Sequence, residues 1–243
     1  MRRRAVVRAS ISLVLGCLVS VAAAQAPRPS SPMILALGST GWLNPSDIQA
    51  ATGALVKQDM ENFQLKDFAV IVLANVAFGS LPASVQQGLV EYVSNGGAIL
   101  ITGGSQSFGS GGYQAVSPII PFQIRSASDW RITPFRPPVL IQPGHPIMAG
   151  VAFLTVGALN DMNPRPDASE ILQAAGGGSA AGRAARAGGG SFPYPLITEV
   201  GAGGGRVIGI AFDLNDFAGM QDRDLFVRNT IGYLLRASQM GRS

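Results

Sequence analysis

Side chains suited to covalent or metal chemistry are scarce in this sequence, which has one cysteine and one histidine among 243 residues. Cys17 lies in an N-terminal segment with the features of an export signal, so removal of that segment would leave the mature chain without a thiol. Disulfides, zinc–thiolate sites and cysteine nucleophiles are then excluded together. Since His145 is the single imidazole, one chain cannot build a multi-histidine metal site. We expect neither a metal nor a cofactor.

A serine hydrolase is the catalytic alternative that these residues leave open. The glycine-rich loop begins Gly103-Gly-Ser-Gln-Ser107, and either Ser105 or Ser107 could act as a nucleophile with His145 as its base. The candidate orienting acids are Asp161 and Asp213. Against this, the loop differs from the Gly-x-Ser-x-Gly elbow of serine hydrolases, and serines in glycine loops usually bond to nearby backbone. A histidine directly before a proline, as here, more often holds a turn than acts as a base.

A calcium loop is a second alternative. Asp213-Leu-Asn-Asp216, together with Asp222 and Asp224, gathers acids before the last predicted helix. Their spacing differs from that of an EF-hand loop, and two of the acids could instead cap the helix. We therefore expect these carboxylates to have a structural role and not to bind calcium.

Residues 68–113 form the stretch that would position the reactive groups. Residues 68–76 are a continuous apolar run rich in β-branched residues, as expected of a strand covered on both faces. Residues 80–97 have a helical apolar pattern that opens at Pro82 and ends in Asn-Gly-Gly. Residues 98–102 are a second buried strand. Strand, helix and strand in this order predict a right-handed βαβ unit in a parallel sheet.

Three glycine-containing turns follow predicted strands, at residues 38–41, 75–79 and 103–112. In open α/β sheets, ligands lie outside the carboxyl ends of the strands, so these turns predict one ligand-binding crevice. Its candidate binding residues are Gly38, Ser39, Asn75, Gly103, Gly104, Ser105 and Tyr113. The alternative is that the glycines only turn the chain.

The other predicted elements alternate strands with irregular stretches. We expect a short edge strand at residues 60–65, an irregular proline-rich stretch at 131–138, strands at 139–141 and 169–174, a hairpin of 195–200 with 206–212, and a final helix over 222–237. Residues 176–191 are glycine, alanine and serine with two arginines. Such a segment has almost no apolar mass to bury, so we expect a flexible loop.

The N-terminus predicts where the protein acts. Residues 1–24 combine four arginines, an apolar core and a small-residue cleavage site, which is typical of an export signal; residues 25–32 are a linker and residues 33–238 one domain. We expect an exported protein, periplasmic or extracellular, with a membrane anchor only if Cys17 is lipidated. The chain has a net charge of +4, and because the signal holds four arginines and no acids, the mature protein is near neutral. We expect no nucleic-acid partner.

Several motifs carry a family resemblance. The segments are Leu81-Pro82, Tyr92-Val-x-Asn-Gly-Gly97, Ile99-Leu-Ile-Thr-Gly-Gly104, Ser107-Phe-Gly-x-Gly-Gly-Tyr113, His145-Pro-Ile-Met-Ala-Gly150 and Gly203-Gly-Gly-Arg206. In this order they resemble the class I glutamine amidotransferase-like superfamily, in particular the amidotransferase-like domains of bacterial envelope proteins and their ThuA-like relatives. The resemblance covers most of residues 33–237.

The resemblance implies an α/β fold, a flavodoxin-like three-layer sandwich with a mostly parallel central sheet. It also implies a Cys-His-Glu triad, with the cysteine on a sharp turn after the strand 98–102 and the His and Glu near the C-terminus. The cysteine position falls here at about Gly103, and no C-terminal histidine exists. Glutaminase chemistry by that mechanism is excluded. We therefore expect a non-catalytic module that binds a small ligand or an envelope partner.

Overall fold

The computed structural model describes residues 31–58, 63–136, 138–152, 156–174, 194–216 and 222–241. The predicted export signal, most of the predicted linker and the predicted flexible loop at 176–191 lie outside these residues.

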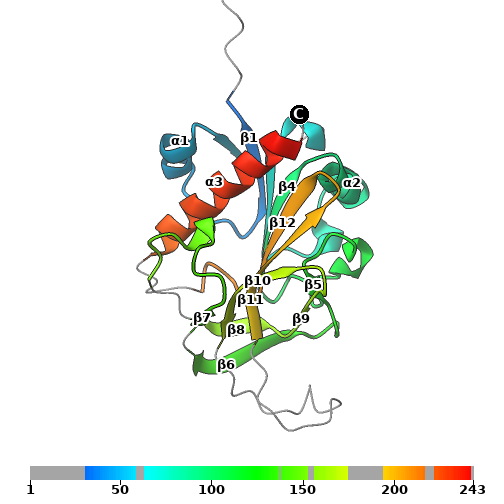
Figure 1. The fold of residues 1–243 in the computed structure, drawn as a ribbon. Coiled ribbons are helices and arrows are strands. Elements are labelled where there is room, and N and C mark those ends of the chain that lie inside the picture. Colours follow the sequence, from blue (N-terminus) through cyan, green and yellow to red (C-terminus); the bar gives the residue numbers. More distant parts are fainter. Residues whose placement is uncertain are drawn as a thin grey trace, which may run out of the picture. The chain divides into compact units, whose positions relative to one another are not determined.

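A single eight-stranded sheet organises the described chain (Figure 1). Its strands, in spatial order, are β2(Leu55–Gln58), β1(Met33–Gly38), β3(Val70–Ala74), β4(Ala98–Thr102), β12(Gly205–Ile210), β11(Tyr194–Ala202), β10(Ser169–Ala174) and β7(Pro138–Leu140). Neighbours from β2 to β12 pair in parallel, whereas β11, β10 and β7 are added by antiparallel pairing. The mostly parallel α/β sheet predicted from the sequence is confirmed.

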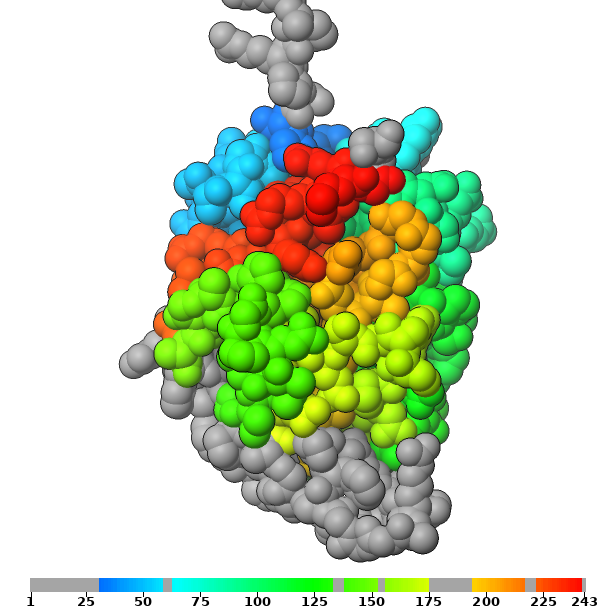
Figure 2. Space-filling view, in the orientation of Figure 1, coloured from blue at the N-terminus to red at the C-terminus, as the bar shows by residue number. Residues whose placement is uncertain are grey.

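Helices cover both faces of this sheet. Alternate side chains of β3 point to opposite faces, so that Val72 packs with α1(Pro45–Thr52) and α3(Arg223–Gly241), while Ile71 packs with α2(Ala83–Ser94). We call these the α3 face and the α2 face. All five residues of β3 are buried, which explains their unbroken apolar pattern. On the face drawn in Figure 2, α3 lies at the surface beside the turn of the β11–β12 hairpin.

Local signals fix the ends of the helices. The Asn44 side chain accepts a hydrogen bond from the Ser46 N–H at 3.1 Å and so caps α1. Gly53, in the left-handed conformation with φ 72°, ends that helix. The edge strand that follows is Leu55–Gln58. Of the edge strand predicted at 60–65, residues 60–62 lie outside the described residues, and Leu65 begins the 3₁₀ helix η1(Leu65–Asp67) instead of ending a strand. The predicted helix after Pro82 and the strand that follows it are confirmed.

The remaining strands form two small sheets. In one, β6(Trp130–Arg136) pairs with β8(Val156–Asn160); in the other, β5(Phe122–Gln123) pairs with β9(Asn163–Pro164). The prediction that residues 131–138 are irregular was therefore wrong. The proline signal is real but local, because Pro134, which has no N–H to donate, lies where the register between β6 and β8 is interrupted. None of the described helices has both the length and the apolar character needed to cross a membrane.

Candidate functional site

The carboxyl ends of β1, β3, β4 and β12 meet at one edge of the sheet. Gly38 is in register with Ala74, Ala74 with Thr102, and Thr102 with Ile210. The three predicted turns therefore emerge side by side, as the parallel arrangement requires. We call the edge formed by these turns the strand-end region.

Asn75 links the turn after β3 to the loop after β4. Its backbone adopts a φ of 40°, a left-handed conformation that asparagine tolerates better than most residues. Its Oδ1 accepts a hydrogen bond from the Gln106 N–H at 2.9 Å, and its Nδ2 donates to Asp213 Oδ2 at 2.6 Å. Both the oxygen and the nitrogen of the Asn75 amide therefore help to hold the turn.

Asp213 extends this network toward β1. Its Oδ1 accepts hydrogen bonds from the backbone N–H of Asn215 at 2.8 Å and from Asn215 Nδ2 at 3.0 Å. Asn215 Nδ2 also donates to the Ser39 carbonyl at 2.7 Å. Burial and the nearby Asp213 charge raise the pKa of the Asp216 carboxyl. The Asp213 carboxylate thus accepts hydrogen bonds from the amide groups of both Asn75 and Asn215.

A second buried pair, Asn160 and Asp129, holds the loop from the other side. Asn160 Oδ1 accepts from the Gly104 N–H at 2.9 Å, and Asn160 Nδ2 donates to Asp129 Oδ1 at 3.0 Å. Asp129 also accepts from the backbone N–H groups of Gly109 at 2.9 Å and Ser110 at 3.0 Å. Because both side chains are almost completely buried, they act as internal supports of the loop.

The structure leaves no space for a side chain at the position where the superfamily has its cysteine. A Cβ at Gly103 would lie 2.5 Å from the Ala211 carbonyl carbon and 2.6 Å from Asn160 Oδ1. Gly104 has a φ of 138°, and its Cβ would lie 2.1 Å from the Asn75 side chain. Real Cβ atoms do not approach other heavy atoms so closely, because packing at such distances is strongly repulsive. Neither position can carry a nucleophile without rearrangement.

Several predicted site residues, among them the alternative nucleophile Ser107, have structural roles. Ser107 is fully buried and donates to the Thr102 carbonyl at 2.7 Å. Tyr113 is also fully buried, donates to the Val76 carbonyl at 2.9 Å, and has a phenol pKa raised by burial. Gly38 approaches the Ala74 carbonyl so closely that a Cβ would lie 2.2 Å from it. By contrast, Ser39 and Ser105 are exposed, and the Ser39 hydroxyl accepts a hydrogen bond from Asn215 Nδ2 at 3.1 Å.

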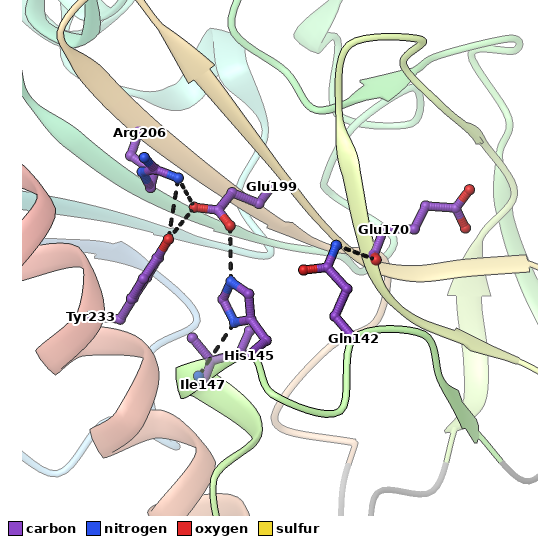
Figure 3. Close-up of polar contacts among 7 residues, drawn as sticks. All are labelled: Gln142, His145, Ile147, Glu170, Glu199, Arg206 and Tyr233. Carbon is purple, nitrogen blue, oxygen red and sulfur yellow. Dashed lines mark hydrogen bonds and ion pairs between the residues drawn. The ribbon is translucent and has the colours of Figure 1, made fainter.

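A different polar cluster lies on the α3 face and contains the single histidine (Figure 3). His145 caps the short 3₁₀ helix η4(Pro146–Met148), with its Nδ1 accepting from the Ile147 N–H at 3.4 Å. Since Nδ1 acts as the acceptor, we place the ring proton on Nε2, which donates to Glu199 Oε2 at 2.9 Å. Both side chains are 7% exposed. Residues on η4 and β11 are thus joined through a buried pair.

The other oxygen of Glu199 binds two further groups. Tyr233 on α3 donates its hydroxyl to Oε1 at 2.6 Å, and Arg206 Nη1 forms an ion pair with the same oxygen. Arg206 Nη1 also donates to the Tyr233 oxygen at 3.2 Å. Burial alone would raise the pKa of the Glu199 carboxyl, but hydrogen bonds from His145, Tyr233 and Arg206 outweigh burial and lower it to about 2. We call these four residues the Glu199 cluster.

His145 does not meet the serines proposed as its catalytic partners. It lies on the α3 face, where the adjoining Ile147 and Met148 are part of the core, whereas Phe108 and Tyr113 of the glycine-rich loop pack on the α2 face. The orienting acids proposed for it are engaged elsewhere: Asp161 pairs with Arg125 and Asp213 binds Asn75. Its actual carboxylate partner, Glu199, was not predicted.

Burial of charge was the signal that could have identified this cluster. Glu199 interrupts the apolar segment 195–200, and Arg206 begins the apolar segment 206–212. A charge in such a strand is costly unless it is paired, so each residue implied a partner. Across the ranges that the structure describes, no group of three or more histidine, cysteine or acidic side chains is arranged to hold a metal ion.

By sequence, the chain matches no protein-family model and no curated protein. Solved structures do match its fold. Cytoplasmic protein STM3548 from Salmonella typhimurium superposes with a TM-score of 0.62 at 15% identity, over 84% of this chain and 98% of the other. Cytoplasmic protein STM1381 from Salmonella typhimurium LT2 gives 0.60 at 12% identity, over 87% and 99%.

A ThuA-like protein from Bacteroides uniformis superposes with a TM-score of 0.52 at 11% identity, over 86% of this chain and 94% of the other. At these identities the matches concern the fold alone. They agree with the resemblance drawn from the sequence motifs. The chain therefore shares its α/β fold with these proteins, one of them ThuA-like, as the motif resemblance implies.

Proposed function

We propose that this protein is an exported, non-catalytic amidotransferase-like module that binds a small ligand or an envelope partner at the strand-end region. The observation that carries the proposal is the closed turn at Gly103. No side chain fits there, and the amide groups around it are already bonded: the N–H of Gly104 to Asn160 and the N–H of Gln106 to Asn75.

An acyl-transfer site needs the opposite arrangement. It holds a nucleophile beside a base, and it leaves N–H donors free for the oxyanion that develops in the transition state. Here two asparagine oxygens occupy two of the donors on the turn, and the histidine is tied to Glu199 on the other face. This supports a binding role over a catalytic one.

The exposed surface of the strand-end region favours a polar, hydrogen-bonding ligand. Its accessible side chains are the hydroxyls of Ser39 and Ser105, the amides of Gln106 and Asn215, and the Asp216 carboxyl. With one acid and otherwise neutral groups, the region suits uncharged hydroxyl- or amide-rich molecules, such as fragments of cell-wall glycan and peptide. Export rests on the N-terminal signal pattern.

Two measurements on the purified mature chain test this proposal. The first is turnover of a panel of glutamine, ester and amide substrates by the wild type and by Ser105→Ala. We expect no turnover above background from either protein. Robust hydrolysis that Ser105→Ala abolishes would overturn the non-catalytic assignment and favour the serine hydrolase.

The second measurement is a thermal-shift screen against cell-wall fragments and polar metabolites. A ligand present at 100 times its Kd stabilises the folded state by about 2.7 kcal/mol, which for a domain of this size raises Tm by about 5 °C or more. We expect Asn215→Ala to reduce the shift and Glu91→Gln, a change at an exposed position on α2, to leave it unchanged. Equal shifts in all three proteins would place the binding site elsewhere.

A further inference from the structure

A pocket of about 550 Å³ opens beside the Glu199 cluster, on the α3 face and away from the strand-end region. Its walls include Arg206 and Tyr233 of the cluster, Arg236 and Met240 of α3, and Pro146 of η4. Figure 2 shows the surface of this face, where α3 borders β12 and the segment that contains η4.

The pocket carries one uncompensated positive charge. Arg206 is paired with Glu199, whereas Arg236 is exposed and forms no ion pair with any described side chain. No aspartate or glutamate belongs to the described residues that line the pocket. A ligand with a single negative charge would therefore match it.

The Glu199 cluster prepares Arg206 to help bind such an anion. Glu199 and Tyr233 both bind the Nη1 nitrogen of Arg206, so the guanidinium is held in place. Its other N–H groups can still donate hydrogen bonds to a ligand. The Arg206 side chain is 38% exposed, and its guanidinium also lies 5.8 Å from the centre of the Tyr233 ring. Holding a donor group in position before binding reduces the entropy lost on binding.

Besides the two arginines and Tyr233, the described lining is apolar except for the amide of Gln239. Pro146 and Met240 line the pocket, and the Met240 side chain is 72% exposed, the second-highest value among the large exposed apolar residues. Methionine adapts its shape readily to an apolar ligand. The lining therefore combines an anion-binding end with an apolar wall.

From this combination we propose that the pocket binds a monoanion with an aliphatic body: a carboxylate whose two oxygens face Arg236 and Arg206, and whose hydrocarbon chain lies along Met240 and Pro146. The site is separate from the strand-end region and does not depend on the function proposed for it. Arginine suits the carboxylate because its planar fork can donate two parallel hydrogen bonds.

Calorimetric titration of the full chain with acetate, hexanoate, octanoate and inorganic phosphate tests the proposal. We expect saturable one-to-one binding of octanoate, with affinity rising about fourfold for each added methylene that is buried. Arg236→Gln should weaken octanoate binding at least about tenfold, because a charge-assisted hydrogen-bond pair is lost. The matched control is Arg228→Gln, which removes the same charge two helical turns earlier on α3, outside the pocket lining, and should change the affinity less than about twofold.

Met240→Ser provides a second test that leaves the charge intact. It should weaken octanoate binding and leave acetate binding unchanged, because only the longer chain reaches the apolar wall. The proposal fails if octanoate does not bind, if Arg236→Gln and Arg228→Gln weaken binding equally, or if phosphate binds as tightly as octanoate with no dependence on chain length. Since Arg236 and Met240 are exposed, both variants are expected to fold.

Discussion

The strand-end region around Gly103 and the Glu199 cluster are both built from buried polar groups, but they satisfy those groups in different ways. At Gly103, asparagine and aspartate side chains bond mainly to backbone amides, and the turn is closed. At Glu199, one carboxylate gathers a histidine, a tyrosine and an arginine, and that arginine also reaches an open pocket. The turn that corresponds to the superfamily's cysteine position thus has no room for a side chain, and the single histidine belongs to the other cluster.

Glu199→Gln should cause the largest change. The variant removes the charge that pairs with Arg206 and weakens the bonds to His145 and Tyr233. Breaking a buried pair costs about 3–5 kcal/mol, and because Arg206 is partly exposed we expect about 3 kcal/mol. The measurement is the free energy of unfolding in urea. The exposed carboxylate variant Glu91→Gln should lose less than about 0.5 kcal/mol; equal losses would show that the Glu199 cluster adds little stability.

Acid should remove a contribution of similar size from the wild type. The pKa of the Glu199 carboxyl is lowered from 4.5 to about 2 in the folded state. Its contribution is therefore complete above pH 4.5 and is lost as the pH falls toward 2. The difference is on the order of 3 kcal/mol. Urea unfolding at several pH values should show this loss in the wild type and a shallower dependence in Glu199→Gln. Parallel pH profiles would contradict the assigned shift.

Gly103→Ala tests whether the turn is closed. Its methyl group would meet the Ala211 carbonyl and Asn160, and overpacking of this kind costs about 2–3 kcal/mol. Gly79→Ala is the control, because a Cβ at Gly79 would meet no atom within 4 Å, and it should change stability by less than about 0.5 kcal/mol. If Gly103→Ala is as stable as the control, the strand-end turn has room for a side chain and the non-catalytic proposal loses its main support.

Tyr233→Phe should have the smallest of these effects. It removes a hydroxyl that donates to a charged carboxylate, which is worth about 1.5 kcal/mol at this half-buried position. A double-mutant cycle with Glu199→Gln separates this bond from packing of the ring, since the loss should shrink when the acceptor is already uncharged. Fully additive losses would mean that the hydroxyl and the carboxylate are not coupled.

Sequence patterns predicted the parts of the fold that depend on local periodicity. The apolar runs of β3 and β4, with the helix between them, follow directly from burial on both faces of a sheet. The meeting of three turns at one edge followed from the rule for parallel strands. The prediction for residues 131–138 was wrong because we took the prolines there to exclude a strand. Strand β6 nevertheless forms, and it pairs with β8 on either side of Pro134.

Charged residues in apolar strands indicated that Glu199 and Arg206 have partners, but the identity of those partners could not be predicted, because it depends on contacts between distant segments. His145 and Glu199 are 54 positions apart, and Glu199 and Tyr233 are 34 apart. Nothing near His145 in sequence indicates which carboxylate will face it. The same holds for the closed turn, where the atoms that exclude a side chain at Gly103 come from Ala211 and Asn160.

The hydrogen bonds of His145 affect how the protein unfolds. It ties η4 to β11 through Glu199, and Asn229 on α3 donates from Nδ2 to the Ala149 carbonyl at 2.8 Å. The short η4 segment is thereby fastened to two core elements at once. Its amide protons should exchange with solvent only when α3 detaches, so that this piece of outer chain unfolds together with the interior in one cooperative step.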